Sequence, residues 1–215
     1  KVIGLDPSTG ASKDGTYSVF FVVALKPNGK KVILNIIREK LEFPQIIDKL
    51  LEMCDRYNPE VLAIEDNAAQ KSIIQQFRFM RQQRRQYPVN IYEHTTTRMN
   101  KEPGIRDLAL EFLQEQWIIP YDNVQHKQIG ENCNCGFCAF LDEIKAYPFG
   151  RYTDTVMACW FASIPLKTSS DPVAKEETID LFLKDDDRFI EENFNFGNDM
   201  YDLPSFMKPK KFDEY

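Results

Sequence analysis

Two acidic side chains follow short apolar runs, at the points where those runs are expected to end as buried strands. Asp6 comes directly after Val2–Leu5, and Glu65 comes directly after Val61–Ile64. Burying an unpaired carboxylate costs free energy, so each acid needs a compensating partner. Each acid alone is explained as the cap of a following turn or helix. Two such acids in one sheet favour a divalent metal, because Mg²⁺ prefers carboxylate and water oxygens.

A third acid, Asp154, stands where an apolar helix is expected to begin. Taken alone, an acid at this position is an N-cap. Three carboxylates on two strand ends and a helix start are also what a two-metal phosphodiester cleavage site needs, with ions about 3.5–4 Å apart and one carboxylate bridging them. Asp6, Glu65 and Asp154 are therefore candidate ligands of two Mg²⁺ or Mn²⁺ ions.

Basic side chains are concentrated between residues 71 and 106, where only two acids accompany them. The eight basic residues are Lys71, Arg78, Arg81, Arg84, Arg85, Arg98, Lys101 and Arg106. This local charge of +6 is either a solvated helix face or a surface that binds phosphates. Our candidates for contacts with the DNA backbone, which position DNA without reading its bases, are Lys71, Arg84, Arg85, Lys101 and Arg106.

Three of the five cysteines stand close together, at Cys133, Cys135 and Cys138, seven residues after His126. Three thiolates and an imidazole can hold a tetrahedral structural Zn²⁺ ion. The alternative is a thiol-rich loop that leads into the next helix. The odd number of cysteines, together with the absence of a leader that would mark a secreted chain, indicates a reducing compartment.

Apolar periodicity and turn residues predict the order of the elements. Three antiparallel strands come first, and an Asn28-Gly29 hairpin joins the second to the third. The expected strands and helices, in chain order, are strands Val2–Leu5, Tyr17–Leu25 and Lys31–Arg38, helix Ile46–Tyr57, strand Val61–Ile64, a helix from Ala69 to Arg85, strand Val89–Glu93, a helix from Ile105 to about Trp117, and helices Ala139–Tyr147 and Asp154–Ile164. Arg98, Lys101 and Arg106 are expected in or beside a loop. This order predicts an α/β sheet with helices on both faces.

The charge divides the chain into two parts. Residues 1–165 carry 20 basic and 20 acidic side chains, whereas residues 166–215 carry 7 and 13 and so account for the whole net charge of −6. We therefore expect a body at 1–165 and an acidic C-terminal tail at 166–215. No apolar run approaches the roughly 18 residues that a membrane span requires.

Four short motifs resemble the nuclease domain of the large terminase subunit of tailed bacteriophages. They are Gly4-Leu5-Asp6-Pro7-Ser8, Ile64-Glu65-Asp66-Asn67, Asn100-Lys101-Glu102-Pro103-Gly104-Ile105-Arg106 and Tyr147-Pro148-Phe149-Gly150-Arg151-Tyr152-Thr153-Asp154. That family belongs to the RNase H-like superfamily, with RuvC-type resolvases and retroviral integrases. The resemblance implies an RNase H-like mixed sheet, with three antiparallel strands followed by parallel ones, over residues 1–165. It also implies that Asp6, Glu65 and Asp154 are catalytic metal ligands, and it singles out Lys101 and Arg106 as DNA contacts.

The last motif departs from the family pattern. The family often has two adjacent acids there, followed by a further Asp before a small residue. In this chain Thr153 precedes Asp154, and Met157 precedes the small residue Ala158. This leaves one acid, and Asp66 is the candidate that would support the site from beside Glu65.

The resemblance implies an endodeoxyribonuclease that hydrolyses phosphodiester bonds by a two-metal mechanism and cuts concatemeric viral DNA during genome packaging. The implied partners are double-stranded DNA, an upstream ATPase domain of the same polypeptide, the portal and the small terminase subunit. The printed sequence contains no G-x-x-x-x-G-K-[ST] phosphate loop, so we expect that ATPase outside it. The implied location is the host cytoplasm, without secretion.

Two alternatives remain open on the sequence. The first is a RuvC-like resolvase that cuts branched DNA with the same acids. The second is a catalytically inactive RNase H-like module that binds partners and is stabilised by zinc. Failure to bind Mn²⁺ at Asp6 would favour the inactive module.

Overall fold

A six-stranded mixed sheet forms the centre of the molecule. The computed structural model describes residues 1–8, 17–66, 68–120, 133 and 135–168. The strands are β1 (Val2–Asp6), β2 (Ser18–Leu25), β3 (Lys31–Glu39), β4 (Val61–Glu65), β5 (Asn90–His94) and β6 (Trp117–Ile118), in the spatial order β5-β4-β1-β2-β3-β6. β1, β2 and β3 pair antiparallel, whereas β4 joins β1, β5 joins β4 and β6 joins β3 in parallel. The expected mixed sheet, with three antiparallel strands followed by parallel ones, is confirmed.

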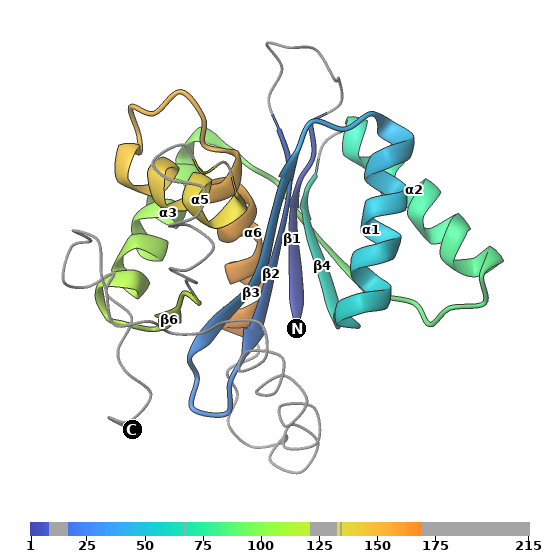
Figure 1. The fold of residues 1–215 in the computed structure, drawn as a ribbon, viewed down its shortest axis with the longest axis horizontal. Helices are drawn as coiled ribbons and strands as arrows, with labels where there is room; N and C mark the ends of the chain where they lie inside the picture. Colours follow the sequence, from blue (N-terminus) through green and yellow to red (C-terminus); the bar gives the residue numbers. More distant parts are fainter. Residues whose placement is uncertain (9–16, 67, 121–132, 134, 169–215) are drawn as a thin grey trace.

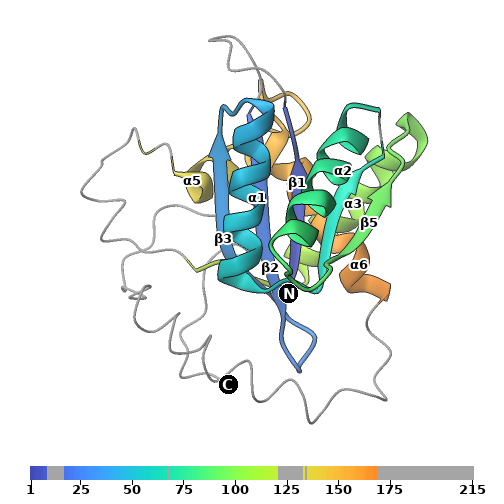
Figure 2. The same cartoon turned by 90° about the vertical axis from the view of Figure 1, so that its right-hand side faces the viewer.

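Helices cover both faces of this sheet. They are α1 (Phe43–Tyr57), α2 (Ala68–Gln83), α3 (Arg98–Leu113), α5 (Gly136–Ala146) and α6 (Asp154–Thr168). Figure 1 shows the sheet nearly edge-on, with α1 and α2 on one side and α3, α5 and α6 on the other. Figure 2 looks onto the α1 and α2 side, with β5 at one edge. A hydrophobic core lies on each face of the sheet, and successive residues of β2 point into opposite cores. Phe20 packs with α1 and α2, whereas Phe21 packs with α3, α5 and α6.

The predicted hairpin between β2 and β3 is confirmed. The backbone N–H of Lys26 donates to the carbonyl oxygen of Lys30 over 2.8 Å, and Gly29 has a φ of 79°. That left-handed conformation suits glycine, because it has no Cβ to clash with the backbone. The tight turn sets the pairing of β2 and β3 next to it, and this register shifts by one residue between Val22 and Val23.

The α2 helix is shorter than its sequence predicts. Arg84 and Arg85 lie in the turn after it, and Arg85 has a φ of 53°, so the expectation that both belong to the helix is wrong. The cause is local: Arg81 is buried, and its guanidinium Nε donates to the carbonyl oxygen of Tyr87 over 3.0 Å. This contact draws the following chain back against the helix end.

The α3 helix, in contrast, begins earlier than expected. Thr97 and Asn100 form a reciprocal capping box, in which each side chain accepts from the backbone N–H of the other. Arg98, Lys101 and Arg106 therefore all lie within the helix and not in a loop. α3 also contains Pro103 in its interior. Proline is normally tolerated only in the first turn of a helix, so the sequence suggested a later start.

The segment after α3 also differs from its prediction. Trp117 was expected to close the helix, but α3 ends at Leu113 and Trp117 begins β6, beside β3. The indole N–H of Trp117 donates to Glu111 Oε2 over 2.9 Å, and Lys31 Nζ lies 2.7 Å from the same oxygen. This buried polar pairing fixes β6 at the edge of the sheet.

The last described helix passes the expected boundary between body and tail. α6 continues through buried Leu166 to Thr168, and the rest of the predicted acidic tail lies outside the described residues. The division into body and tail therefore stays a prediction. Among the described helices, none has the length and apolar character needed to cross a bilayer.

Candidate active site

The first two acids leave the sheet together. β1 and β4 are parallel neighbours, and Leu5 lies opposite Ile64 in their register. Asp6 and Glu65 are the next residues along each strand, so both stand at the same end of the sheet, the upper end in Figure 1. Both side chains are half-buried.

Helix α6 brings the third acid to the same end. It packs directly on β1, because a Cβ at Gly4 would collide with the carbonyl oxygen of Ala158. Asp6 is two residues beyond Gly4 on the same face of the strand, and Asp154 is one helical turn before Ala158. The contact between glycine and helix therefore aligns Asp154 with Asp6. We call Asp6, Glu65 and Asp154 the acidic cluster.

Asp6 is the most perturbed member of the acidic cluster. Burial raises the pKa of its carboxyl well above the ordinary value, and the negative charges of Asp154 and Glu65 raise it further, while the Lys101 ammonium opposes them. The ionised form is therefore costly without a cation. A divalent ion with oxygen ligands would offset that cost, so the cluster fits Mg²⁺ or Mn²⁺.

The donor oxygens of the acidic cluster are spread out. Within the described residues they are not all within 4.8 Å of one another. Asp6 is the member whose carboxyl is influenced electrostatically by both of the other acids.

Asp154 is held by contacts that reach beyond its own helix. Its Oδ2 accepts from the backbone N–H of Tyr17, just before β2, over 3.1 Å. Burial raises the pKa of Asp154, and the Tyr17 hydrogen bond and the Arg38 guanidinium oppose this rise. The acid therefore bridges α6 and the start of β2 in addition to standing at a helix N-terminus.

Glu65 has two neighbours at the end of β4. Gln70 Nε2 donates to Glu65 Oε2 over 3.3 Å. His94, in β5, is the residue opposite Glu65 in the parallel pairing of β4 and β5. Burial lowers the pKa of His94, which the nearby Glu65 charge opposes. The His94 ring packs edge-on against Trp160, with 5.0 Å between ring centroids, but its Nε2 meets no hydrogen-bond partner among the described residues.

Two residues that the sequence analysis missed support Asp154. Glu143, in α5, accepts through Oε2 from the backbone N–H and hydroxyl of Thr155, the former over 2.8 Å. Its Oε1 accepts from Arg38 Nε over 3.1 Å, and the Arg38 guanidinium stacks 3.5 Å from the centroid of the Tyr17 ring. An acid among the apolar positions of the predicted α5 helix was the available signal for Glu143. Nothing in the sequence linked Arg38 to it.

Asp66, the acid expected to support the site from beside Glu65, contacts a lysine and a threonine. Its Oδ1 lies 3.0 Å from Lys71 Nζ, and its Oδ2 accepts from the Thr95 hydroxyl over 3.5 Å. Lys71, a candidate DNA contact, is thereby held beside the end of β4.

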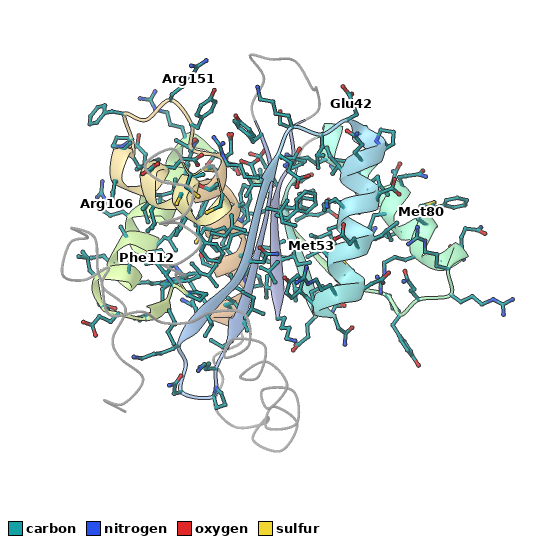
Figure 3. All side chains as sticks on the ribbon, in the orientation of Figure 1. Glu42, Met53, Met80, Arg106, Phe112 and Arg151 are labelled. Atoms are coloured by element: carbon teal, nitrogen blue, oxygen red, sulfur yellow. The ribbon has the colours of Figure 1, made fainter. Side chains whose placement is uncertain are left out.

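The basic stretch is divided between the two faces of the sheet. Lys101 lies in α3 near Asp6, and Figure 3 shows Arg106 on the same side of the sheet as α3. Arg84 and Arg85 follow the far end of α2, a helix about 24 Å long. Lys71 and Lys101 thus accompany the acidic cluster, whereas Arg84 and Arg85 do not.

The cysteine group is brought together at the start of α5. The sulfur atoms of Cys133, Cys135 and Cys138 all lie within 4.8 Å of one another. His126, the fourth predicted ligand, lies outside the described residues.

The chain is similar to solved structures with which it shares little sequence identity. No protein-family model matches the chain, and no curated protein matches its sequence. RuvC of T. thermophilus in complex with a Holliday junction substrate is 14% identical, with a TM-score of 0.43 over 80% of this chain and 96% of that chain. The yeast mitochondrial Holliday junction resolvase Ydc2 is 10% identical, with a TM-score of 0.47 over 89% of this chain and 85% of that chain. At this level of similarity neither structure assigns an activity to the chain.

Proposed function

We propose that this chain is a metal-dependent endodeoxyribonuclease that hydrolyses phosphodiester bonds at the acidic cluster. The observation that carries the proposal is the environment of Asp6, a half-buried carboxyl whose pKa is raised by burial and by the charges of Asp154 and Glu65. Asp6, Glu65 and Asp154 would hold two Mg²⁺ or Mn²⁺ ions. When bound, such ions supply an activated water and stabilise the leaving oxygen.

The residues around the acidic cluster have positioning roles in this proposal. Gln70 orients Glu65 through a hydrogen bond, and Glu143 holds the start of the helix that carries Asp154. Lys101 supplies a positive charge beside Asp6, where it can attract the phosphate to be cut. These groups fix the ligands and the substrate before any bond changes.

The substrate in this proposal is duplex DNA. Lysine and arginine contacts hold phosphates irrespective of sequence, so the isolated domain should cut with little sequence preference. The motif resemblance supports concatemeric viral DNA as the natural substrate, in which case the ATPase, the portal and the small terminase subunit would choose the site. The same acids would serve a resolvase acting on four-way junctions.

Cleavage assays with a linear concatemer and a synthetic four-way junction test the activity and the substrate together. We expect Mg²⁺- or Mn²⁺-dependent cutting of the linear duplex at many positions. Asp6→Asn, Glu65→Gln and Asp154→Asn should each abolish it, because each removes a metal ligand. Asp48→Asn, an exposed acid in α1 on the other face of the sheet, is the matched control and should cut normally.

Three outcomes would change the proposal in different ways. Symmetric cutting of the junction alone, with the linear duplex left intact, would replace the concatemer by branched DNA. Wild-type cutting by Asp6→Asn would refute the catalytic assignment. DNA binding without cutting by a folded wild-type chain that fails to bind Mn²⁺ would favour the inactive binding module.

A further inference from the structure

Three thiols converge where the chain enters α5. Cys133, Cys135 and Cys138 are half-buried, and the structure records them as thiols and not as a disulfide. Their sulfur atoms all lie within 4.8 Å of one another. Sulfur ligands about 2.3 Å from a tetrahedral ion lie about 3.8 Å apart, so only a small inward movement would bring the three thiols to that spacing.

The backbone already has the form of a metal-binding turn. Cys135 is the N-cap of α5, and the backbone N–H of Cys138 donates to Cys135 Sγ over 3.4 Å. Two of the ligands are thus arranged by the helix start itself.

The scaffold under the thiols is fixed by the core. A Cβ at Gly136 would collide with the carbonyl oxygen of Ile36, so the start of α5 rests directly on β3. One turn later, Phe140 is fully buried and packs edge-on against Phe21, with 5.0 Å between ring centroids. These contacts hold Cys135 and Cys138 in place whether or not an ion is bound.

We propose that Cys133, Cys135 and Cys138 are three thiolate ligands of one structural Zn²⁺ ion. Thiolates select soft or borderline ions such as zinc over Mg²⁺ or Mn²⁺, so this site is chemically distinct from the acidic cluster. The ion would tie the chain before α5 to the helix that carries Glu143. The proposal does not depend on nuclease activity.

A disulfide is the competing use of three close thiols. It would join two sulfur atoms and leave the third unbonded, whereas zinc uses all three equivalently. The two cases therefore differ in metal content and in the number of titratable thiols.

Metal analysis of the full chain, purified with a non-thiol reductant, tests the proposal. We expect about one zinc per chain in the wild type, and loss of most of it in each of Cys133→Ser, Cys135→Ser and Cys138→Ser. Cys54→Ala, which removes a buried core thiol, and Asp6→Asn, which alters the acidic cluster, should both keep their zinc. Retention by Asp6→Asn separates the two sites even if the nuclease assignment fails.

A measurement on the wild-type chain covers the case in which a serine variant does not fold. Titration with a mercurial thiol reagent should release zinc to a colorimetric chelator as the thiols are modified, and Co²⁺ substitution should give the visible absorption of a tetrahedral thiolate site. A zinc-free wild type that takes up neither Zn²⁺ nor Co²⁺ would overturn the proposal. So would full zinc content in Cys135→Ser, or a chain purified without reductant that shows only three of its five thiols when it is unfolded in denaturant.

Discussion

Glu143 and Arg38 illustrate how a single buried ion pair supports a site that it does not touch directly. Their side chains are 7% and 11% exposed, so neither charge has water to compensate it if the other is removed. Glu143 also receives two hydrogen bonds from Thr155, next to Asp154. The pair therefore determines where the acid at the start of α6 lies.

Removing one member of this pair should be costly. We expect Glu143→Met to lower the free energy of unfolding by roughly 3 kcal/mol, because the Arg38 charge is left buried and unpaired. The double variant Arg38→Met/Glu143→Met should regain much of that stability yet still cut DNA poorly, since Thr155 has lost its acceptor. Urea unfolding and plasmid cleavage measure the two effects, and normal cleavage by the double variant would contradict the positioning role.

At the scale of elements, the contact between β1 and α6 brings the acidic cluster together. The backbones approach closely at Gly4, where the carbonyl oxygen of Ala158 occupies the space that a side chain would need. This contact fixes the position of α6, which carries Asp154, along β1, which carries Asp6.

Gly4→Ala should therefore act on stability and activity together. The added methyl group must push α6 away from β1, at a cost of about 1–3 kcal/mol from overpacking, and Asp154 moves with the helix. Thermal unfolding and Mn²⁺-dependent cleavage measure these effects. Gly29→Asn, in the exposed hairpin turn, is the control and should change both little, because asparagine tolerates a positive φ. Full activity in Gly4→Ala would show that the contact does not set the site.

Two pairs of basic residues should differ in their contribution to DNA binding. Lys101 and Arg106 lie in α3 on the side of the acidic cluster, whereas Arg84 and Arg85 follow the far end of α2. We expect Lys101→Ala/Arg106→Ala to reduce the slope of log affinity against log salt by about 2, one unit for each phosphate that is no longer neutralised. Arg84→Ala/Arg85→Ala removes the same charge and should change the slope less. The affinities are measured by fluorescence anisotropy in a catalytically inactive variant. If both double variants reduce the slope of log affinity against log salt equally, α3 has no special role in DNA binding.

At the scale of the whole molecule, the acidic cluster makes stability depend on pH and on metal. The folded pKa of Asp6 is raised above its unfolded value, so its protonated form favours folding at low pH. That contribution is lost as the pH rises through the folded pKa. Above the folded pKa the ionised carboxylate therefore opposes folding until a divalent cation binds.

Asp6→Asn should remove this dependence on pH and on metal. Without added divalent ions, we expect the variant to melt above the wild type at alkaline pH, and the gap to close as the pH falls through the raised folded pKa of Asp6. Each kcal/mol of repulsion removed corresponds to about 2–4 °C in Tm for a chain of this size. Mg²⁺ should raise the Tm of the wild type more at the higher pH and leave the variant nearly unchanged. Calorimetry that finds the same Tm for both proteins at every pH would remove the electrostatic argument for the metal site.

The local pattern of the sequence determined most of the sheet and the candidate acids. Val2–Leu5 and Val61–Ile64 are short apolar runs bounded by turn residues, a pattern that favours buried strands, and the acids that follow them lie at the strand ends. The Asn28-Gly29 pair determined the hairpin for the same reason, since its backbone preference is a property of neighbouring residues. The cysteine spacing likewise pointed to a cluster that the described thiols form.

The tertiary structure alone decided which side chains meet. Arg38 and Glu143 are 105 residues apart, so their pairing depends on how α5 packs against β3 and leaves no trace in local spacing. The same holds for the basic stretch, which is continuous in sequence but is divided between opposite faces of the sheet because β5 lies between α2 and α3 in the chain. Arg81 looked like a surface charge and was buried by a contact with Tyr87. Local propensity acts over a few residues, whereas these pairings arise from packing the elements into one sheet.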